Sequence, residues 1–363
     1  MHKGRPAKII LANILVLFGL LVVLEGFSSY ALVGYRLLTN KPTPERPHTA
    51  FDAELGWINL PDLHVKDRFG PGRSLTTNSQ RFRNRVTITP AVPPNKIRLI
   101  CSGDSFTLGY GVDDAHAWCH LLTKIDARLQ TVNLGHGGYG VDQAYLWYER
   151  NKNDLEHDVH LFAFIADDFR RMTSGTDTYT GYARPYLSIE NQEISQTNYP
   201  LSKRSVHVRR IANEARELTQ LASVDLLSKI YRRILSAETS SPAGTLRRTE
   251  AVVAKIFSEL QQSNSNKSSV FVLVFLPTRE DYMGRNAATE HWRQFTKSES
   301  EKNGFYFVDL IEDFRTVHPT GVDALFRDHY SEQGNKLFAD LLYRKLGEIP
   351  EIRRRLDRID QAR

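Results

Sequence analysis

The chain opens with a long, almost uninterrupted apolar run. His2 and three lysine or arginine residues precede it, and the run extends from Ile9 to Val33 with Glu25 as its one charged residue. A helix needs about 20 apolar residues to cross a bilayer, so we expect residues 9–33 to be a transmembrane segment. Basic flanks stay on the cytoplasmic side. We therefore expect residues 1–8 to form a cytoplasmic stub and the remainder of the chain to lie outside the cytoplasm.

A cleaved signal peptide is the competing interpretation of this segment. Its apolar region would normally be shorter, and a cleavage site of the small-x-small kind would follow it. Ser28, Ser29 and Ala31 make a poor site of that kind. We favour an uncleaved signal anchor in the inner (cell) membrane, with the rest of the chain in the periplasm or an equivalent extracytoplasmic space.

Beyond the anchor, the pattern changes from linker to β-rich to alternating α/β. Residues 34–50 contain three prolines and a polar stretch, which predicts an extended linker. Residues 51–95 carry short strand-like pieces between turn residues, and we interpret them as a β-rich lead-in. Further on, helical patterns alternate with short apolar runs that predict buried strands at Ile97–Cys101, Thr131–Leu134, Val159–Ile165, Val270–Phe275 and Phe305–Leu310. This alternation predicts an α/β domain over residues 96–346, built on a parallel sheet covered on both faces.

Residues 171–265 break the alternation and predict an insertion. It begins with a hairpin-like pattern over 186–195, and three helical stretches follow near 205–221, 224–236 and 245–261. Helices are also expected from Asp113 or Asp114 to Ile125, over 143–150 and over 334–346. We expect residues 347–363 to form a basic C-terminal tail.

Composition narrows the classes of partner. The net charge is +6 at pH 7, which fits a basic solvated surface or attraction to an anionic lipid or acidic glycan. Nucleic acid is not expected, because no binding motif with interleaved aromatic residues occurs. Cys101 and Cys119 match no metal spacing, so no metal or other cofactor is expected. We expect two buried free thiols, with a single disulfide as the alternative for an extracytoplasmic domain.

The main candidate for chemistry is a serine that directly follows a predicted strand. Gly103-Asp104-Ser105-Phe106 comes straight after Ile97–Cys101. In an open α/β sheet, ligands bind beyond the carboxyl ends of the strands, and glycine permits a tight turn there. A turn without function is the alternative for so short a motif, with Asp104 as a candidate binding residue if the site is real.

Three further polar clusters favour a catalytic role for Ser105. Glycines over 133–140 follow the second predicted strand, and their N–H groups can approach an oxyanion. Asp167 follows the third strand, and His329 precedes the last predicted helix. A serine needs a base to become nucleophilic, and His329 can supply it with a carboxylate fixing its tautomer.

This arrangement resembles the SGNH/GDSL hydrolase family over residues 96–346, with the insertion excluded. The resemblance lies in "GDSFTLGYGV", "NLGHGGYGVDQ" and "DHYSEQGNKLFADLL". It implies a flavodoxin-like three-layer sandwich in which Ser105 is the nucleophile, Gly138 donates to the oxyanion and His329 is the base. The lead-in is similar to a segment of membrane-anchored bacterial members, which often act on acyl groups of surface or secreted polysaccharides.

Two positions depart from the family pattern. Asp167 stands where the family places an oxyanion-donating Asn, so it would serve only if burial kept it protonated, and pairing with Arg170 or Arg171 is the alternative. The family's acid stands three residues before the histidine, where this chain has Phe326. Asp328 is our first candidate for that acid and Asp323 the second, and a site without an acid is the third.

The sequence thus predicts a serine esterase acting on O-acyl groups, acetyl above all, of an extracytoplasmic polysaccharide or another ester. An O-acyltransferase shares the same acyl-enzyme and is not separated from it by sequence. A glycan-binding protein on a catalytically weakened scaffold is the alternative from another class. Oligomeric state is left open.

Overall fold

The structure is a computed structural model that describes residues 5–39, 48–173, 175, 182–202, 242–285, 287–317 and 321–361. The chain divides into two compact units, of which the first contains the N-terminal helix and the second contains most residues from 46 onward. Helix α1 (Arg5–Thr39) includes a stretch of 24 residues, Lys8–Ala31, with a mean hydropathy of 2.5. It is long and apolar enough to cross a membrane, in agreement with the predicted span.

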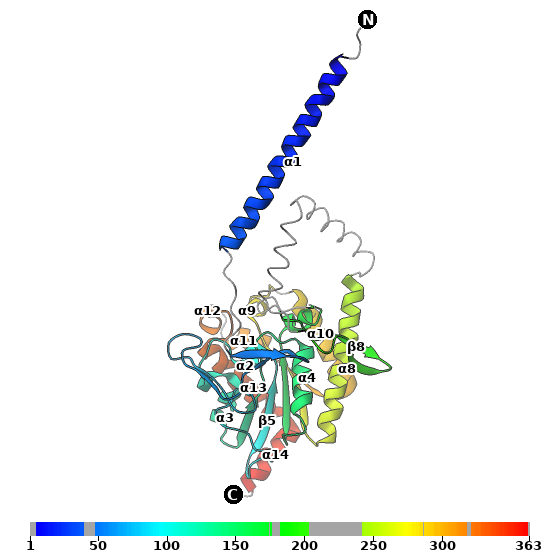
Figure 1. Cartoon of the computed structure of the whole chain (residues 1–363). Coiled ribbons are helices and arrows are strands. Elements are labelled where there is room, and N and C mark those ends of the chain that lie inside the picture. The colour runs from blue at the N-terminus through cyan, green and yellow to red at the C-terminus, as the bar shows by residue number, and fades with distance from the viewer. Residues whose placement is uncertain are drawn as a thin grey trace. The chain divides into compact units, whose positions relative to one another are not determined.

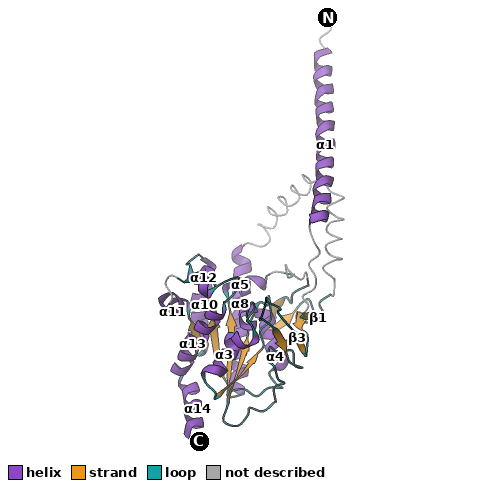
Figure 2. Cartoon of the chain, turned by 90° about the vertical axis from the view of Figure 1, so that its left-hand side faces the viewer, coloured by secondary structure: helices purple, strands orange, loops and turns teal. Residues whose placement is uncertain are grey.

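The second unit is built on a five-stranded parallel sheet (Figures 1 and 2). Its strands are β5 (Ile97–Ser102), β6 (Leu129–Asn133), β7 (Val159–Phe164), β10 (Val270–Phe275) and β11 (Tyr306–Asp309). They lie in the order β11-β10-β7-β5-β6. Numbered along the chain from the other edge, this is 2-1-3-4-5, the flavodoxin-like order of doubly wound sheets. The predicted α/β fold class and all five predicted strands are confirmed.

Helices cover both faces of this sheet because its strands are apolar on both sides. Successive side chains of a strand point to opposite faces. On β7, Phe162 and Phe164 belong to one buried cluster, whereas Leu161 and Ala163 belong to the other. The first cluster includes α4 (Val141–Asn151), α8 (Pro242–Asn266) and α10 (Ala287–Asn303). The second includes α3 (Trp118–Ile125), α13 (Glu332–Glu348) and α14 (Pro350–Gln361). The result is the three-layer sandwich that the sequence predicts.

The lead-in forms two short antiparallel hairpins. β1 (Thr49–Asp52) pairs with β2 (Gly56–Asn59), and β3 (Leu63–Val65) pairs with β4 (Leu75–Thr77). The remaining short helices are α2 (Ser105–Leu108), η1 (Asp114–His116), α5 (Ala166–Arg171), α9 (Arg279–Tyr282), α11 (Ile311–Val317) and α12 (Val322–Leu325). Most of them come directly after a strand of the large sheet, at the edge where its carboxyl ends lie.

The structure changes the boundaries of the expected insertion. Its hairpin is present as β8 (Leu187–Glu190) and β9 (Glu193–Gln196), whereas the helices expected near 205–221 and 224–236 lie outside the described residues. Helix α8 belongs to the central domain, because its residues Val253, Ile256 and Phe257 are buried against the sheet. It also provides the crossover that two parallel neighbours, β7 and β10, require.

Two further expectations are corrected. The expected basic tail over 347–363 is described as far as residue 361, and most of that part is helix α14, whose apolar residues Ile352, Leu356 and Ile359 recur along one side and pack into the core. Cys101 and Cys119 form a disulfide instead of two free thiols. Their Cα atoms lie 6.4 Å apart, within the range that a disulfide spans, and both residues belong to the same buried cluster.

Candidate active site

The turn after β5 places Ser105 at the start of helix α2. Gly103 has a φ of +153°, and a Cβ atom there would lie 2.4 Å from the carbonyl oxygen of Ala163 and 2.4 Å from Oγ1 of Thr107. Only glycine fits this approach of β5 to β7. The following residue, Asp104, caps α2 by accepting a hydrogen bond from the Phe106 N–H at 2.8 Å.

Ser105 and His329 meet at this turn. Nε2 of His329 lies 2.8 Å from Oγ of Ser105, within the reach that proton transfer from a nucleophile to its base requires. Oγ of Ser105 also lies 3.4 Å from a carboxylate oxygen of Asp104. The shorter contact makes His329 the preferred acceptor of the serine proton.

Aromatic packing holds the imidazole of His329. Its ring centroid lies 4.7 Å from that of Phe106 and 5.0 Å from that of Tyr110. Its loop is fixed to the start of α13 by Asn335, whose side chain donates to the carbonyl oxygens of Tyr330 and Ser331. The Asn335 side chain also accepts from the backbone N–H of Trp118 at 3.0 Å, so the histidine loop is tied to α3.

Neither candidate acid contacts His329. Asp323 is exposed and forms an ion pair with Arg279. Asp328 is also exposed, and its carboxylate has no hydrogen bond or ion pair with any residue that the structure describes. The expectation that one of them lies against the far nitrogen of the imidazole is therefore not met. Asp323 lies in the short helix α12, and Asp328 lies in the segment between α12 and α13.

Asp167 pairs with two arginines. It lies 2.6 Å from Arg170 and 3.2 Å from Arg171. Partial burial raises the pKa of Asp167, but the hydrogen bond from Arg170 and the charges of both arginines outweigh burial and leave that pKa below its usual range. An ionised carboxylate cannot donate to an oxyanion. These ion pairs favour the pairing alternative over a protonated Asp167 that stabilises the oxyanion.

Gly138 lies in the loop after β6 with a φ of +80°. Its backbone N–H forms no hydrogen bond with a described residue, and the same is true of the N–H of Ser105. The loop begins at Asn133, whose side chain donates to the Thr107 carbonyl at 2.8 Å and accepts from the Gly135 N–H at 2.9 Å. The strand that carries the glycine loop is thereby joined to the helix that carries Ser105.

The lead-in holds the glycine loop from its other side. Trp57 donates its indole N–H to the carbonyl oxygen of Gly137 at 3.0 Å, and the hydroxyl of Tyr139 donates to the carbonyl oxygen of Trp57 at 2.7 Å. The buried ring of His136 accepts from the Asn59 N–H at 3.1 Å. Burial lowers the pKa of His136 to about 4. Sequence reasoning missed these contacts, because nothing in the local pattern joins residues some 80 positions apart.

Arg171 forms a second network that the sequence did not reveal. Its guanidinium donates to Asp104, to Asp168 and to the carbonyl oxygen of Tyr139. Both carboxylates are buried. Burial and the neighbouring charge of Asp104 raise the pKa of Asp168, and Arg171 opposes the rise. One side chain thus joins the loops after β5, β6 and β7. The spacing of Asp168 and Arg171 on α5 is a local signal of a pair, but the contact with Asp104 depends on the fold.

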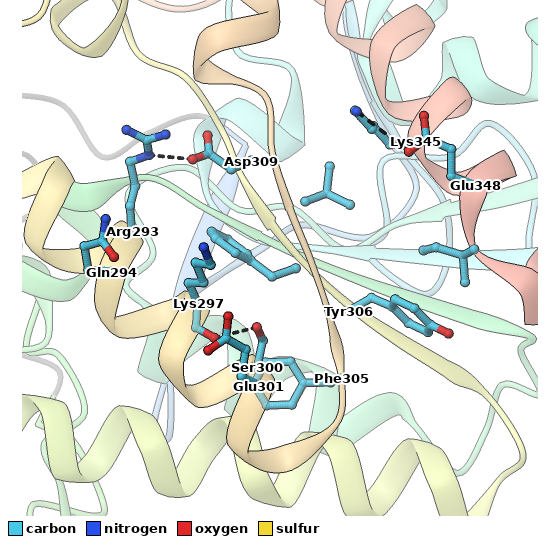
Figure 3. A pocket seen from close by; sticks show the side chains of 13 residues that line it. Arg293, Gln294, Lys297, Ser300, Glu301, Phe305, Tyr306, Asp309, Lys345 and Glu348 are labelled. Atoms are coloured by element: carbon cyan, nitrogen blue, oxygen red, sulfur yellow. Dashed lines mark hydrogen bonds and ion pairs between the residues drawn. The ribbon is translucent and has the colours of Figure 1, made fainter.

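A hollow of about 510 Å³ opens beside His329. The lead-in contributes Arg68, Phe69 and Arg73 to its lining, and the histidine loop contributes Arg327. A second hollow of about 650 Å³ lies over β11, between α10 and α13 (Figure 3). It contains none of the site residues that the sequence predicted. His329, the base in contact with Ser105, lines the first hollow, and we therefore take that hollow as the candidate active site.

No family model matches the chain, and no curated protein matches it. It is similar to several solved structures. A lipolytic protein of the G-D-S-L family from Veillonella parvula DSM 2008 has 14% identity and a TM-score of 0.39, covering 67% of this chain and 94% of its own. The psychrotrophic esterase EstA from Pseudoalteromonas sp. has 11% identity and a TM-score of 0.40, covering 69% and 97%. The acetyl xylan esterase AlAXEase has 14% identity and a TM-score of 0.39, covering 69% and 99%. At TM-scores below 0.5 these similarities do not determine an activity for this chain.

Proposed function

We propose that this chain is a membrane-anchored serine esterase of the SGNH/GDSL type, acting on O-acyl groups through an acyl-enzyme on Ser105. The observation that carries the proposal is the 2.8 Å contact between Oγ of Ser105 and Nε2 of His329. A serine with a base in this position can attack an ester carbonyl. The binding-protein alternative is not favoured, because a binding scaffold has no need of this contact.

In the proposed reaction, His329 first accepts the Ser105 proton as Oγ attacks the ester carbonyl carbon. The imidazolium then gives that proton to the departing alcohol, and an acyl-serine forms. Water attacks the acyl-serine with His329 again as base. A sugar hydroxyl in place of water would make the chain an acyltransferase.

The N–H groups of Ser105 and Gly138 are the proposed oxyanion donors. Neither donates to a described residue, so both are available to a carbonyl oxygen that gains charge. An oxyanion donor is worth about 10²–10³ in rate. Arg171 supports the same step, because it offsets the negative charge of Asp104 beside the nucleophile.

The proposed location is outside the cytoplasm, with α1 as the anchor. The basic residues before the span favour this orientation. The Cys101–Cys119 disulfide adds independent support, because structural disulfides persist in oxidising compartments. An acetylated polysaccharide of that compartment is the proposed substrate class. Protease added to osmotically opened cells with a sealed inner membrane is expected to digest residues 48–361, and full protection would contradict this location.

Labelling by a fluorophosphonate probe tests the proposed chemistry, because such probes react with an activated serine whatever the natural substrate. We expect the full chain to be labelled, and Ser105→Ala and His329→Ala to lose the label. Ser102→Ala is the matched control, since Ser102 is a buried serine three residues away whose hydroxyl contacts a different histidine, His160. Equal labelling of Ser105→Ala and the unmodified chain would contradict the proposal.

A further inference from the structure

Three arginines line the hollow beside His329 without a carboxylate partner. Arg68, Arg73 and Arg327 form no ion pair with any residue that the structure describes. At the hollow over β11 (Figure 3), by contrast, two of the three basic residues are paired, Arg293 with Asp309 and Lys345 with Glu348.

Two of these guanidinium groups are held in place by neutral contacts. Arg73 donates to the carbonyl oxygen of Gly111 at 3.3 Å. Arg68 donates to the imidazole of His48 at 3.3 Å, and its guanidinium carbon lies 5.5 Å from the centre of the Phe69 ring. Such contacts fix the positions of the positive groups without neutralising them.

The acidic groups of the hollow do not offset this charge. They are Asp328 and Glu332, against three guanidinium groups. Glu332 lies 3.9 Å from the ring of His116 and is more than half exposed. Asp328 is exposed and pairs with none of the arginines.

Aromatic rings connect the arginines to the catalytic base. Phe69 contacts Tyr110 with ring centroids 4.6 Å apart, and Tyr110 contacts His329 with centroids 5.0 Å apart. Arg68, Phe69, Tyr110 and His329 therefore follow one another along the lining of the hollow, which leads from the positive groups to the base. The apolar faces of Phe69 and Tyr110 suit a sugar ring beside it.

We infer that this hollow binds a carboxylate-bearing sugar, so that the enzyme acts on O-acylated acidic sugars of the uronic acid class. The inference rests on the proposed esterase function and adds the substrate class. Guanidinium groups bind planar carboxylates through two parallel N–H donors, and hydrogen bonds to charged groups are stronger than those between neutral groups.

The test compares O-acetylated methyl glucuronoside with O-acetylated methyl glucoside, which differ in the carboxylate alone. We expect the purified full chain to have a kcat/KM at least about tenfold higher for the glucuronoside, with the advantage shrinking as salt is raised. Arg73→Gln and Arg327→Gln are each expected to reduce that ratio about tenfold. Arg353→Gln, an exposed arginine on α14 at the other end of the sheet from α2 (Figure 1), is the control and should retain the ratio.

Equal kcat/KM values for the two sugars would overturn the inference while leaving the esterase function intact. An acetylated glucose 6-phosphate preferred over the glucuronoside would also overturn it, by assigning the arginines to phosphate. If no ester is turned over, calorimetric binding of the acetylated glucuronoside and glucoside to Ser105→Ala decides the matter. Tighter binding of the glucuronoside supports the inference, and equal or absent binding of both overturns it.

Discussion

The indole N–H of Trp57 donates to the carbonyl oxygen of Gly137 at 3.0 Å, and this bond joins the lead-in to the loop that presents Gly138. The lead-in follows the predicted linker directly in sequence, yet it contacts the loop that carries the proposed oxyanion donor. A chain that starts at β5 would keep Ser105 and His329 but would lose the contacts that position the proposed oxyanion donor.

Trp57→Phe is expected to lower kcat about tenfold with little change in KM, because it removes the indole N–H that holds the Gly137 carbonyl oxygen. Steady-state kinetics with p-nitrophenyl acetate measures this split. Trp147→Phe is the matched control, because Trp147 is in the same buried cluster and its indole nitrogen has no hydrogen bond. Equal kinetic effects of both substitutions would mean that Trp57 contributes only through the packing of its ring and not through its hydrogen bond.

His136 should make the lead-in contact sensitive to acid. Its pKa is about 4 in the folded chain and about 6.5 in an unfolded one. A base with a lowered folded pKa contributes stability that is complete above pH 6.5 and is lost as pH falls towards 4. The free energy of unfolding should fall by about 3 kcal/mol over this interval on account of His136. Urea denaturation at several pH values measures it, and His136→Gln should show a shallower decline than the unmodified chain. Parallel declines in the two proteins would exclude this role.

Arg171 is expected to matter far more than its neighbour Arg170. Arg171→Met leaves Asp104 and Asp168 buried without their shared counter-charge, which typically costs about 3–5 kcal/mol, and activity should fall with it. Arg170→Met removes a surface pair with Asp167, in which the arginine is 71% exposed, and should change stability by less than about 1 kcal/mol. Denaturation midpoints of the two variants provide the comparison. Similar midpoints would contradict the account of the Arg171 network.

Asp328→Asn and Asp323→Asn are each expected to retain kcat within about tenfold of the unmodified chain. Removing the acid of a full catalytic triad lowers kcat by about 10⁴, but neither of these carboxylates contacts His329. His329→Ala serves as the reference for complete loss of the base. A loss near 10⁴ in either Asp variant would assign that residue as the triad acid.

The sequence predicted the sheet well because its strands are buried on both faces and therefore appear as continuous apolar runs, such as Val270–Phe275. It also predicted the contact between Ser105 and His329, because Ser105 follows the end of a predicted strand and His329 precedes the last predicted helix. The sequence failed to predict contacts that depend on the direction in which a side chain points. The adjacent Asp328 was expected against His329, but its side chain is exposed, and Asp167 pairs with two arginines.

Contacts distant in sequence were also beyond prediction. The Cys101–Cys119 disulfide needs the start of α3 to lie beside the end of β5, within the distance that a disulfide spans. The Arg171 network needs three loops to converge, and the Trp57–Gly137 bond needs the lead-in to pack beside the sheet. Periodicity fixes none of these distances, since it reports which face of an element is buried and not which neighbour covers it.

Acid-quenched mass analysis of the chain during turnover of p-nitrophenyl acetate tests the central claim most directly. The account predicts a mass increase of one acetyl group, located on the peptide that contains Ser105 and absent in Ser105→Ala. An acetyl group on another residue, or turnover by Ser105→Ala at the rate of the unmodified chain, would contradict it.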